Sequence, residues 1–101
     1  MATSTPFPIL PKVALVGLGE RISQARRVRG MTQSELAQSA RVGLSTIVAI
    51  EAGSPSVNIG AIMRALDSMG LLQQVDKWLD PHLDPKFAEQ AVRQLQQRAR
   101  R

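Results

Sequence analysis

The amino-acid sequence predicts an all-α fold: a compact bundle of about five helices with an extended N-terminal arm and a C-terminal helical tail. Three observations favour this class. Apolar residues recur at steps of three and four along most of the chain, which is the spacing of amphipathic helices. Aromatic residues make up only 3% of the sequence, so the core must be largely aliphatic, and that disfavours a β-sandwich. Signals for helix starts and stops separate the apolar segments.

The length of 101 residues fits one domain with a tail. We expect an arm at residues 1–12, a domain at residues 13–80 and a basic helical tail at residues 81–101. The absence of cysteine excludes disulfides, thiol catalysis and thiolate metal sites. One histidine, His82, cannot build a metal site alone. We therefore expect no enzyme activity and no cofactor. No apolar stretch is long enough to cross a membrane and no signal-peptide pattern is present, so we expect a cytoplasmic location.

The N-terminal half of the chain predicts three helices. The first ends at Gly30, and its start is expected near Leu18, because Gly17 and Gly19 each cost about 1 kcal/mol inside a helix. The second covers residues 32–39 and begins with a capping box, in which a threonine and a glutamate three residues later satisfy each other's backbone N–H groups. The third covers residues 43–52.

Three further helices follow. One begins at Asn58 and ends at Gly70, one covers residues 71–79, and the last begins at Asp84, with proline at its first helical position. The residues 71–79 carry an apolar set that could form a dimer interface: Leu72, Val75, Trp78 and Leu79. The alternative interpretation is that the tryptophan covers the domain core.

The second and third helices, joined by a turn of three or four residues, have the spacing of a helix-turn-helix. Residues 18–53, LGERISQARRVRGMTQSELAQSARVGLSTIVAIEAG, strongly resemble the Cro/λ-repressor-like (XRE) helix-turn-helix family. The resemblance implies a λ-repressor-like domain that binds double-stranded operator DNA, with the third helix in the major groove. The matching residues are Arg26, Gly30, Thr32, Gln33, Glu35, Leu36, Ala37, Val42, Ser45, Thr46, Ile47, Ile50, Glu51 and Gly53.

The resemblance also implies roles for particular residues. Gln33, in the first turn of the second helix, would contact a phosphate; the alternative is a solvated helix residue. Arg26 and Glu51 would form a structural ion pair that holds the third helix at a fixed angle. The candidate DNA contacts are Thr32, Gln33, Arg41, Gly43, Leu44, Ser45, Thr46, Val48, Ala49, Ser56 and Asn58.

The chain departs from the family at the turn and on the base-facing side. Arg41 occupies the turn position where glycine is usual, and no base-facing side chain can make a two-bond contact to guanine or adenine. Three interpretations stay open. The protein reads thymine methyl groups and DNA shape. Arg41 or the N-terminal arm supplies the missing polar contacts. Or the chain has lost DNA binding and kept a protein partner.

A second resemblance concerns residues 51–60, together with residues 64–66, 69–72 and the Arg-Ala-Arg-Arg end. These stretches are similar to HipB-type antitoxin regulators. This similarity implies a homodimeric repressor that also binds a HipA-like kinase toxin. The alternatives are an XRE-type repressor without a toxin, and a helical interaction module that binds a partner without reading DNA.

The formal net charge of +5 lies in two clusters. Five arginines fall between Arg21 and Arg41, on helices expected to face phosphates. The second cluster is the tail from Arg93. Three roles are open for it: a solvated, frayed chain end, non-specific contact with phosphates, and docking on an acidic partner. Residues 42–92 are acidic on balance, which would leave a side for a protein partner.

Overall fold

A computed structural model describes residues 5–100 of the chain. Within this range it contains helices and no strand, which confirms the all-α prediction. The first four residues of the predicted arm lie outside the described part. The elements are α1 (Ile9–Val28), α2 (Gln33–Ala40), α3 (Leu44–Glu51), α4 (Ile59–Ser68), the 3-10 helices η1 (Leu72–Lys77) and η2 (Pro81–Leu83), and α5 (Pro85–Ala99).

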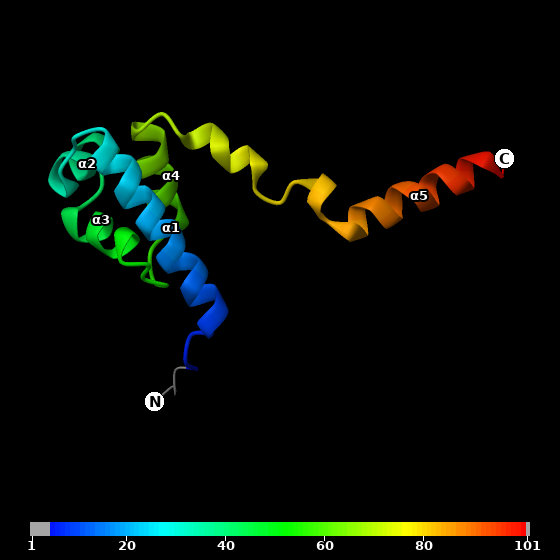
Figure 1. Cartoon of the computed structure of the whole chain (residues 1–101), viewed down its shortest axis with the longest axis horizontal. Helices are drawn as coiled ribbons and strands as arrows, with labels where there is room; N and C mark the ends of the chain where they lie inside the picture. Colours follow the sequence, from blue (N-terminus) through cyan, green and yellow to red (C-terminus); the bar gives the residue numbers. More distant parts are fainter. Residues whose placement is uncertain (1–4, 101) are drawn as a thin grey trace.

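Helices α1 to α4 gather around one aliphatic core (Figure 1). Leu36 of α2 and Ile47 of α3 are fully buried at its centre. Both fit the predicted apolar faces. The other buried members of the core are Ile22, Ala37, Ile50, Ile62, Ala65, Leu66 and Met69.

Helix α1 begins at Ile9, so the predicted start near Leu18 was wrong, and the last four residues of the predicted arm are helical. Residues 5–8 are exposed and have no regular structure. The extra turns are stabilised by contacts with the end of α3. Lys12 Nζ donates a hydrogen bond of 2.6 Å to the carbonyl of Gly53, and Val16 packs against the same glycine. Such tertiary contacts outweigh the poor helix propensity of the glycines in α1.

The predicted helix at residues 71–79 is instead the 3-10 helix η1. The Leu71 N–H donates its hydrogen bond to the carbonyl of Leu66, and this bond closes the end of α4. Trp78 then turns extended, and Leu79 has a φ of 60°. Only the six residues Leu72–Lys77 remain between these two breaks, and they form i to i+3 bonds, as short helical pieces that act as connectors often do.

Helix α5 lies apart from the α1–α4 bundle (Figure 1). The radius of gyration is 18.8 Å, against about 13 Å for a compact chain of this length. All residues of α5 are exposed. Among residues 5–100, no helix is long and apolar enough to cross a membrane, and no group of three potential ligands could hold a metal ion.

Candidate nucleic-acid interface

The capping box orients the start of α2. Thr32 Oγ1 accepts a hydrogen bond of 3.0 Å from the Glu35 N–H, and Glu35 Oε1 accepts one of 3.0 Å from the Thr32 N–H. The bond from the Thr32 backbone N–H to the Glu35 carboxylate lowers the pKa of Glu35, and the Thr32 side chain lowers it further. The pair satisfies two of the first helical N–H groups, and the dipole leaves this end of α2 positive.

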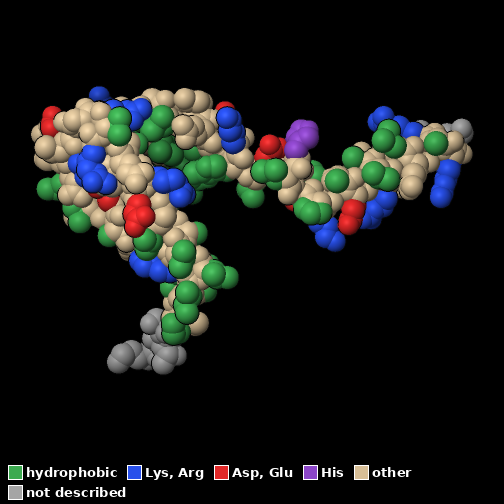
Figure 2. Space-filling view, in the orientation of Figure 1, with side chains coloured by type: hydrophobic (Ala, Val, Ile, Leu, Met, Phe, Trp, Pro, Cys, Tyr) green, Lys and Arg blue, Asp and Glu red, His purple; other side chains and the backbone are tan. Residues whose placement is uncertain are grey.

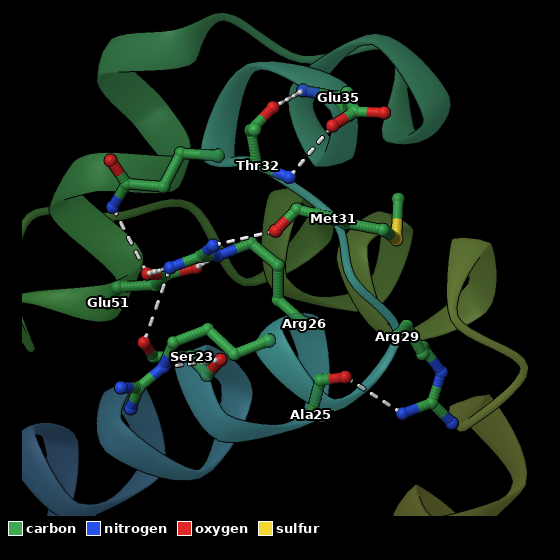
Figure 3. A network of polar contacts seen from close by, with 10 residues as sticks. Ser23, Ala25, Arg26, Arg29, Met31, Thr32, Glu35 and Glu51 are labelled. Atoms are coloured by element: carbon green, nitrogen blue, oxygen red, sulfur yellow. Dashed lines mark hydrogen bonds and ion pairs between the residues drawn. The ribbon is translucent and has the colours of Figure 1, made fainter.

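An ion pair joins α1 to α3 (Figure 3). Arg26 Nε donates to Glu51 Oε2 at 2.7 Å and Arg26 Nη2 donates to Oε1 at 2.9 Å, a two-bond geometry. The Arg26 side chain is 12% exposed and that of Glu51 is 7% exposed. A further bond of 2.8 Å from Arg26 Nη1 to the Met31 carbonyl connects the pair to the loop before α2. The network therefore holds α1, the end of α3 and the loop that leads into α2 together.

Gln33 takes part in the same network. Its Nε2 donates a hydrogen bond of 3.1 Å to Glu51 Oε1, so the start of α2 is tied to the end of α3. Burial by itself would raise the pKa of Glu51, but the hydrogen bonds from Arg26 and Gln33 and the charge of Arg26 hold that pKa below its usual value. The half-buried Gln33 thus has a positioning role that the sequence did not reveal. Its predicted phosphate contact stays a prediction.

The turn between α2 and α3 passes through Arg41 in the left-handed conformation, with φ 58° and ψ 45°. Glycine adopts this conformation without strain, whereas another residue adopts it at a cost of about 1 kcal/mol. The Arg41 side chain at this turn is exposed and follows α2 directly, three residues before α3 begins. Gly43 then caps α3 with no side chain, so backbone N–H groups of the first turn are directed outward.

Helix α3 buries one side and exposes the other. Ile47 and Ile50 are buried in the core. On the outer side, Leu44 is 48% exposed and Val48 is 45% exposed. Ser45 is also exposed, while Thr46 and Ala49 are half-buried. The exposed surface is therefore mostly apolar, with one hydroxyl and no charge.

An open groove of about 770 Å³ runs between the turn, α3 and the start of α4. It brings together seven of the predicted contact residues: Arg41, Gly43, Ser45, Thr46, Ala49, Ser56 and Asn58. Thr32, Gln33, Leu44 and Val48 lie outside its lining. At the start of α4, Asn58 Oδ1 caps the helix by accepting a 2.6 Å bond from the Gly60 N–H. The groove thus meets the N-termini of two helices.

Arg64 lines this groove and was missed by the sequence analysis. Its Nη1 donates to the backbone carbonyl of Arg41 at 3.4 Å, so a second exposed arginine side chain reaches the turn at this groove. In the sequence, Arg64 is the single cation within the mostly apolar residues 59–66. Its link to the groove depends on the packing of α4 beside the turn, which the sequence does not show.

The predicted basic cluster between Arg21 and Arg41 does not form one surface. Arg26 is half-buried and engaged in the ion pair, and Arg21 lines a different groove, between α1 and η1. Arg29 Nη1 donates to the carbonyl of Ala25 in its own helix. Figure 2 shows basic side chains at several separate places on the visible face of the bundle.

Only two of the four residues of the predicted dimer interface share one surface. Val75 and Trp78 line the groove against α1, and Val75 packs on the core. Trp78 is 42% exposed and Leu79 is 96% exposed. Leu72 and Leu79 are not part of that groove lining. Trp78 therefore lines the groove with one part of its ring and exposes another part. This arrangement is compatible with both interpretations of the tryptophan, as a cover for the domain core and as part of a dimer interface.

Comparison with known proteins agrees with this arrangement. The family pattern described as helix-turn-helix matches residues 22–71. A protein of Sinorhizobium fredii, described as an uncharacterised HTH-type transcriptional regulator, is 38% identical over 53 residues, which are 52% of this chain and 70% of that protein. No solved structure matches the chain.

Proposed function

The chain belongs to the helix-turn-helix family, and from this premise we propose that it is a DNA-binding transcriptional repressor. It would bind a near-palindromic operator as a homodimer, with α3 of each copy in the major groove. Half-sites would lie about one DNA turn apart, or a multiple of it. The observation that carries the proposal is the groove lined by the turn, by Ser45 and Thr46 of α3, by the start of α4 and by two arginines.

The phosphate contacts would come from the edges of this groove. Arg41 and Arg64 supply charge on one side, and the N-terminus of α4 supplies backbone N–H groups near Ser56 and Asn58. Thr32 and Gln33, at the start of α2, are proposed as further phosphate contacts. Phosphate contacts set position and general affinity without reading sequence.

Base reading would come from α3. Ser45 can make one hydrogen bond to a base edge, and Leu44 and Val48 can contact a thymine methyl group. Ala49 and Thr46 line the groove and are half-buried, so they would contact the DNA only through close approach. Arg41, at the edge of the groove, is the proposed source of the additional polar contact. Specificity would therefore depend strongly on methyl groups and DNA shape.

Fluorescence anisotropy on labelled duplexes from the gene's own promoter tests the proposal. We expect binding at low salt that weakens as salt rises, and tighter binding than to a scrambled duplex. Ser45→Ala should change the preference between duplexes that differ at single base pairs. Arg64→Gln should weaken binding to all duplexes alike. Absence of binding at low salt would contradict the repressor and favour the interaction module.

We further propose that this repressor is a HipB-like antitoxin. The support is the similarity of residues 51–60, 64–66 and 69–72 to that group. The test is co-expression with a neighbouring kinase-like reading frame, followed by purification of a complex and an assay of the kinase. Inhibition of the kinase supports the antitoxin. DNA binding without any complex would leave a repressor that has no toxin.

A further inference from the structure

Helix α5 is amphipathic and exposes its apolar side. Phe87, Ala91 and Leu95 recur at steps of four, and Val92 and Ala88 widen the same stripe, whereas the opposite side carries Glu89, Arg93 and Gln97. Phe87 is 55% exposed, and no residue of the helix is buried. Figure 2 shows hydrophobic side chains along the protruding arm.

Such a helix requires a covering surface. An isolated helix of 15 residues is marginal in water, because most helical stability in proteins comes from packing of the apolar side. Pairing of two α5 helices with each other would not suffice. The stripe spans fewer than two heptads, whereas an apolar pattern over about three or four heptads is what indicates a coiled coil.

An apolar groove lies on the bundle between α1 and η1. Its volume is about 410 Å³, and its floor and walls include Leu18, Ile22, Val75 and Trp78. Along α1 it extends from Ala14 to Ala25, which at 1.5 Å per residue is about 16 Å. The anchors of α5, from Phe87 to Leu95, span about 12 Å by the same rule. The groove is therefore long enough for the α5 stripe.

The connection between the groove and α5 directs the helix away from its own bundle. Asp80 Oδ1 accepts a 3.0 Å bond from the His82 N–H, and Asp84 Oδ1 accepts a 2.9 Å bond from the Lys86 N–H. A proline follows each aspartate and fixes φ at the first position of η2 and of α5. α5 lies apart from its own bundle, and folding back onto its own groove would require the backbone of residues 78–84 to change direction. A second copy can be reached with this connection unchanged.

We propose that α5 of one copy lies in the α1–η1 groove of a second copy, and that the exchange is reciprocal. A two-fold arrangement of this kind is closed and buries both helices and both grooves. The inference rests on the proposed homodimer and names the segments that hold it together. The interface is separate from the α3 groove, which stays open to DNA.

The first test compares two full-length variants on α5 with the same change of charge. Leu95→Glu places a carboxylate in the apolar stripe, whereas Gln97→Glu places one on the polar side. Sedimentation equilibrium should show a dimer for the unaltered chain and for Gln97→Glu, and at least a tenfold weaker dimer for Leu95→Glu. Equal dimer stability in both variants would overturn the inference.

The second test uses the absence of natural cysteine. One chain carries Ala14→Cys in the groove, a second carries Ala91→Cys on α5, and the mixture is treated with a short bis-maleimide. A covalent heterodimer is expected, with little product when Gln97→Cys replaces Ala91→Cys. An uncrosslinked dimer would overturn the exchange and leave the proposed homodimer intact. A chain that stays monomeric would overturn both. Intramolecular product in the double variant Ala14→Cys/Ala91→Cys, without heterodimer from the mixture, would show fold-back and also overturn it.

Neither test depends on DNA binding. If operator binding fails while the crosslink forms, the proposed repressor fails and the exchanged dimer stands. If Leu95→Glu becomes monomeric and loses tight operator binding but keeps weak binding at low salt, the dimer and the DNA contact are both supported, because loss of the second half-site lowers avidity. Far-UV circular dichroism of Leu95→Glu checks that α1 to α4 stay folded.

Discussion

A β-carbon on Gly19 would lie 2.5 Å from the carbonyl oxygen of Ile50. Helix α1 therefore touches the backbone at the end of α3 at a point where only glycine fits. Gly53, with a φ of 75°, makes a matching approach to the backbone of Val16. Two glycines thus set the distance between α1 and the helix proposed to enter DNA.

Gly19→Ala should lower the free energy of unfolding by more than about 2 kcal/mol, because the Ile50 carbonyl is backbone and cannot move aside alone. Gly17→Ala is the matched control. Its new β-carbon would meet only the flexible end of Arg21, at 3.3 Å. It should stabilise the protein by up to about 1 kcal/mol through helix propensity. Urea denaturation measures both, and equal effects would contradict the close approach.

Glu51→Gln should destabilise the protein by about 3 kcal/mol, because Arg26 would keep its charge in a nearly buried position without a carboxylate. The control is Glu89→Gln on α5. Glu89 lies 3.6 Å from Arg93, and both side chains are more than half exposed. Removal of that surface pair should cost less than about 1 kcal/mol. Thermal or urea denaturation compares the two, and a cost for Glu51→Gln as small as the control's would show that the network is not stabilising.

The stability should depend on pH in the acid range. The pKa of Glu51 is lowered in the folded state, so its contribution is complete above its unfolded pKa of about 4.3 and is lost as the pH falls through the folded pKa. Urea midpoints should therefore change little from pH 7 to about pH 5 and fall below that. In Glu51→Gln the decrease should be shallower. An identical decrease in both proteins would assign it to other carboxylates, such as Glu35.

Arg41→Gly should act in opposite directions on stability and on DNA binding. Relief of the left-handed strain should stabilise the fold by about 0.5–1 kcal/mol, after allowance for the greater freedom of glycine in the unfolded chain. Loss of one phosphate contact should reduce the salt slope of DNA binding by about one. Arg21→Gln removes the same charge from the other groove and should leave the slope unchanged. A slope equal in both variants would place Arg41 away from the DNA.

Local signals in the sequence were sufficient for several elements. The Thr32–Glu35 capping box, the start of α4 at Asn58 and the start of α5 after Asp84 were all predicted, because each is encoded within three or four adjacent residues. The spacing of α2 and α3 was read correctly for the same reason. Apolar residues at helical steps placed Leu36 and Ile47 inward.

The sequence by itself thus determined an all-α chain with a helix-turn-helix, since helix periodicity, caps and turns are short-range properties. Only the tertiary structure decided where α1 begins, because the contacts of Lys12 and Val16 with Gly53 join residues about forty positions apart. It also brought Gln33 to Glu51 and Arg64 to Arg41. These contacts depend on how helices pack, and packing is set by shape and charge across the whole core rather than by any local pattern.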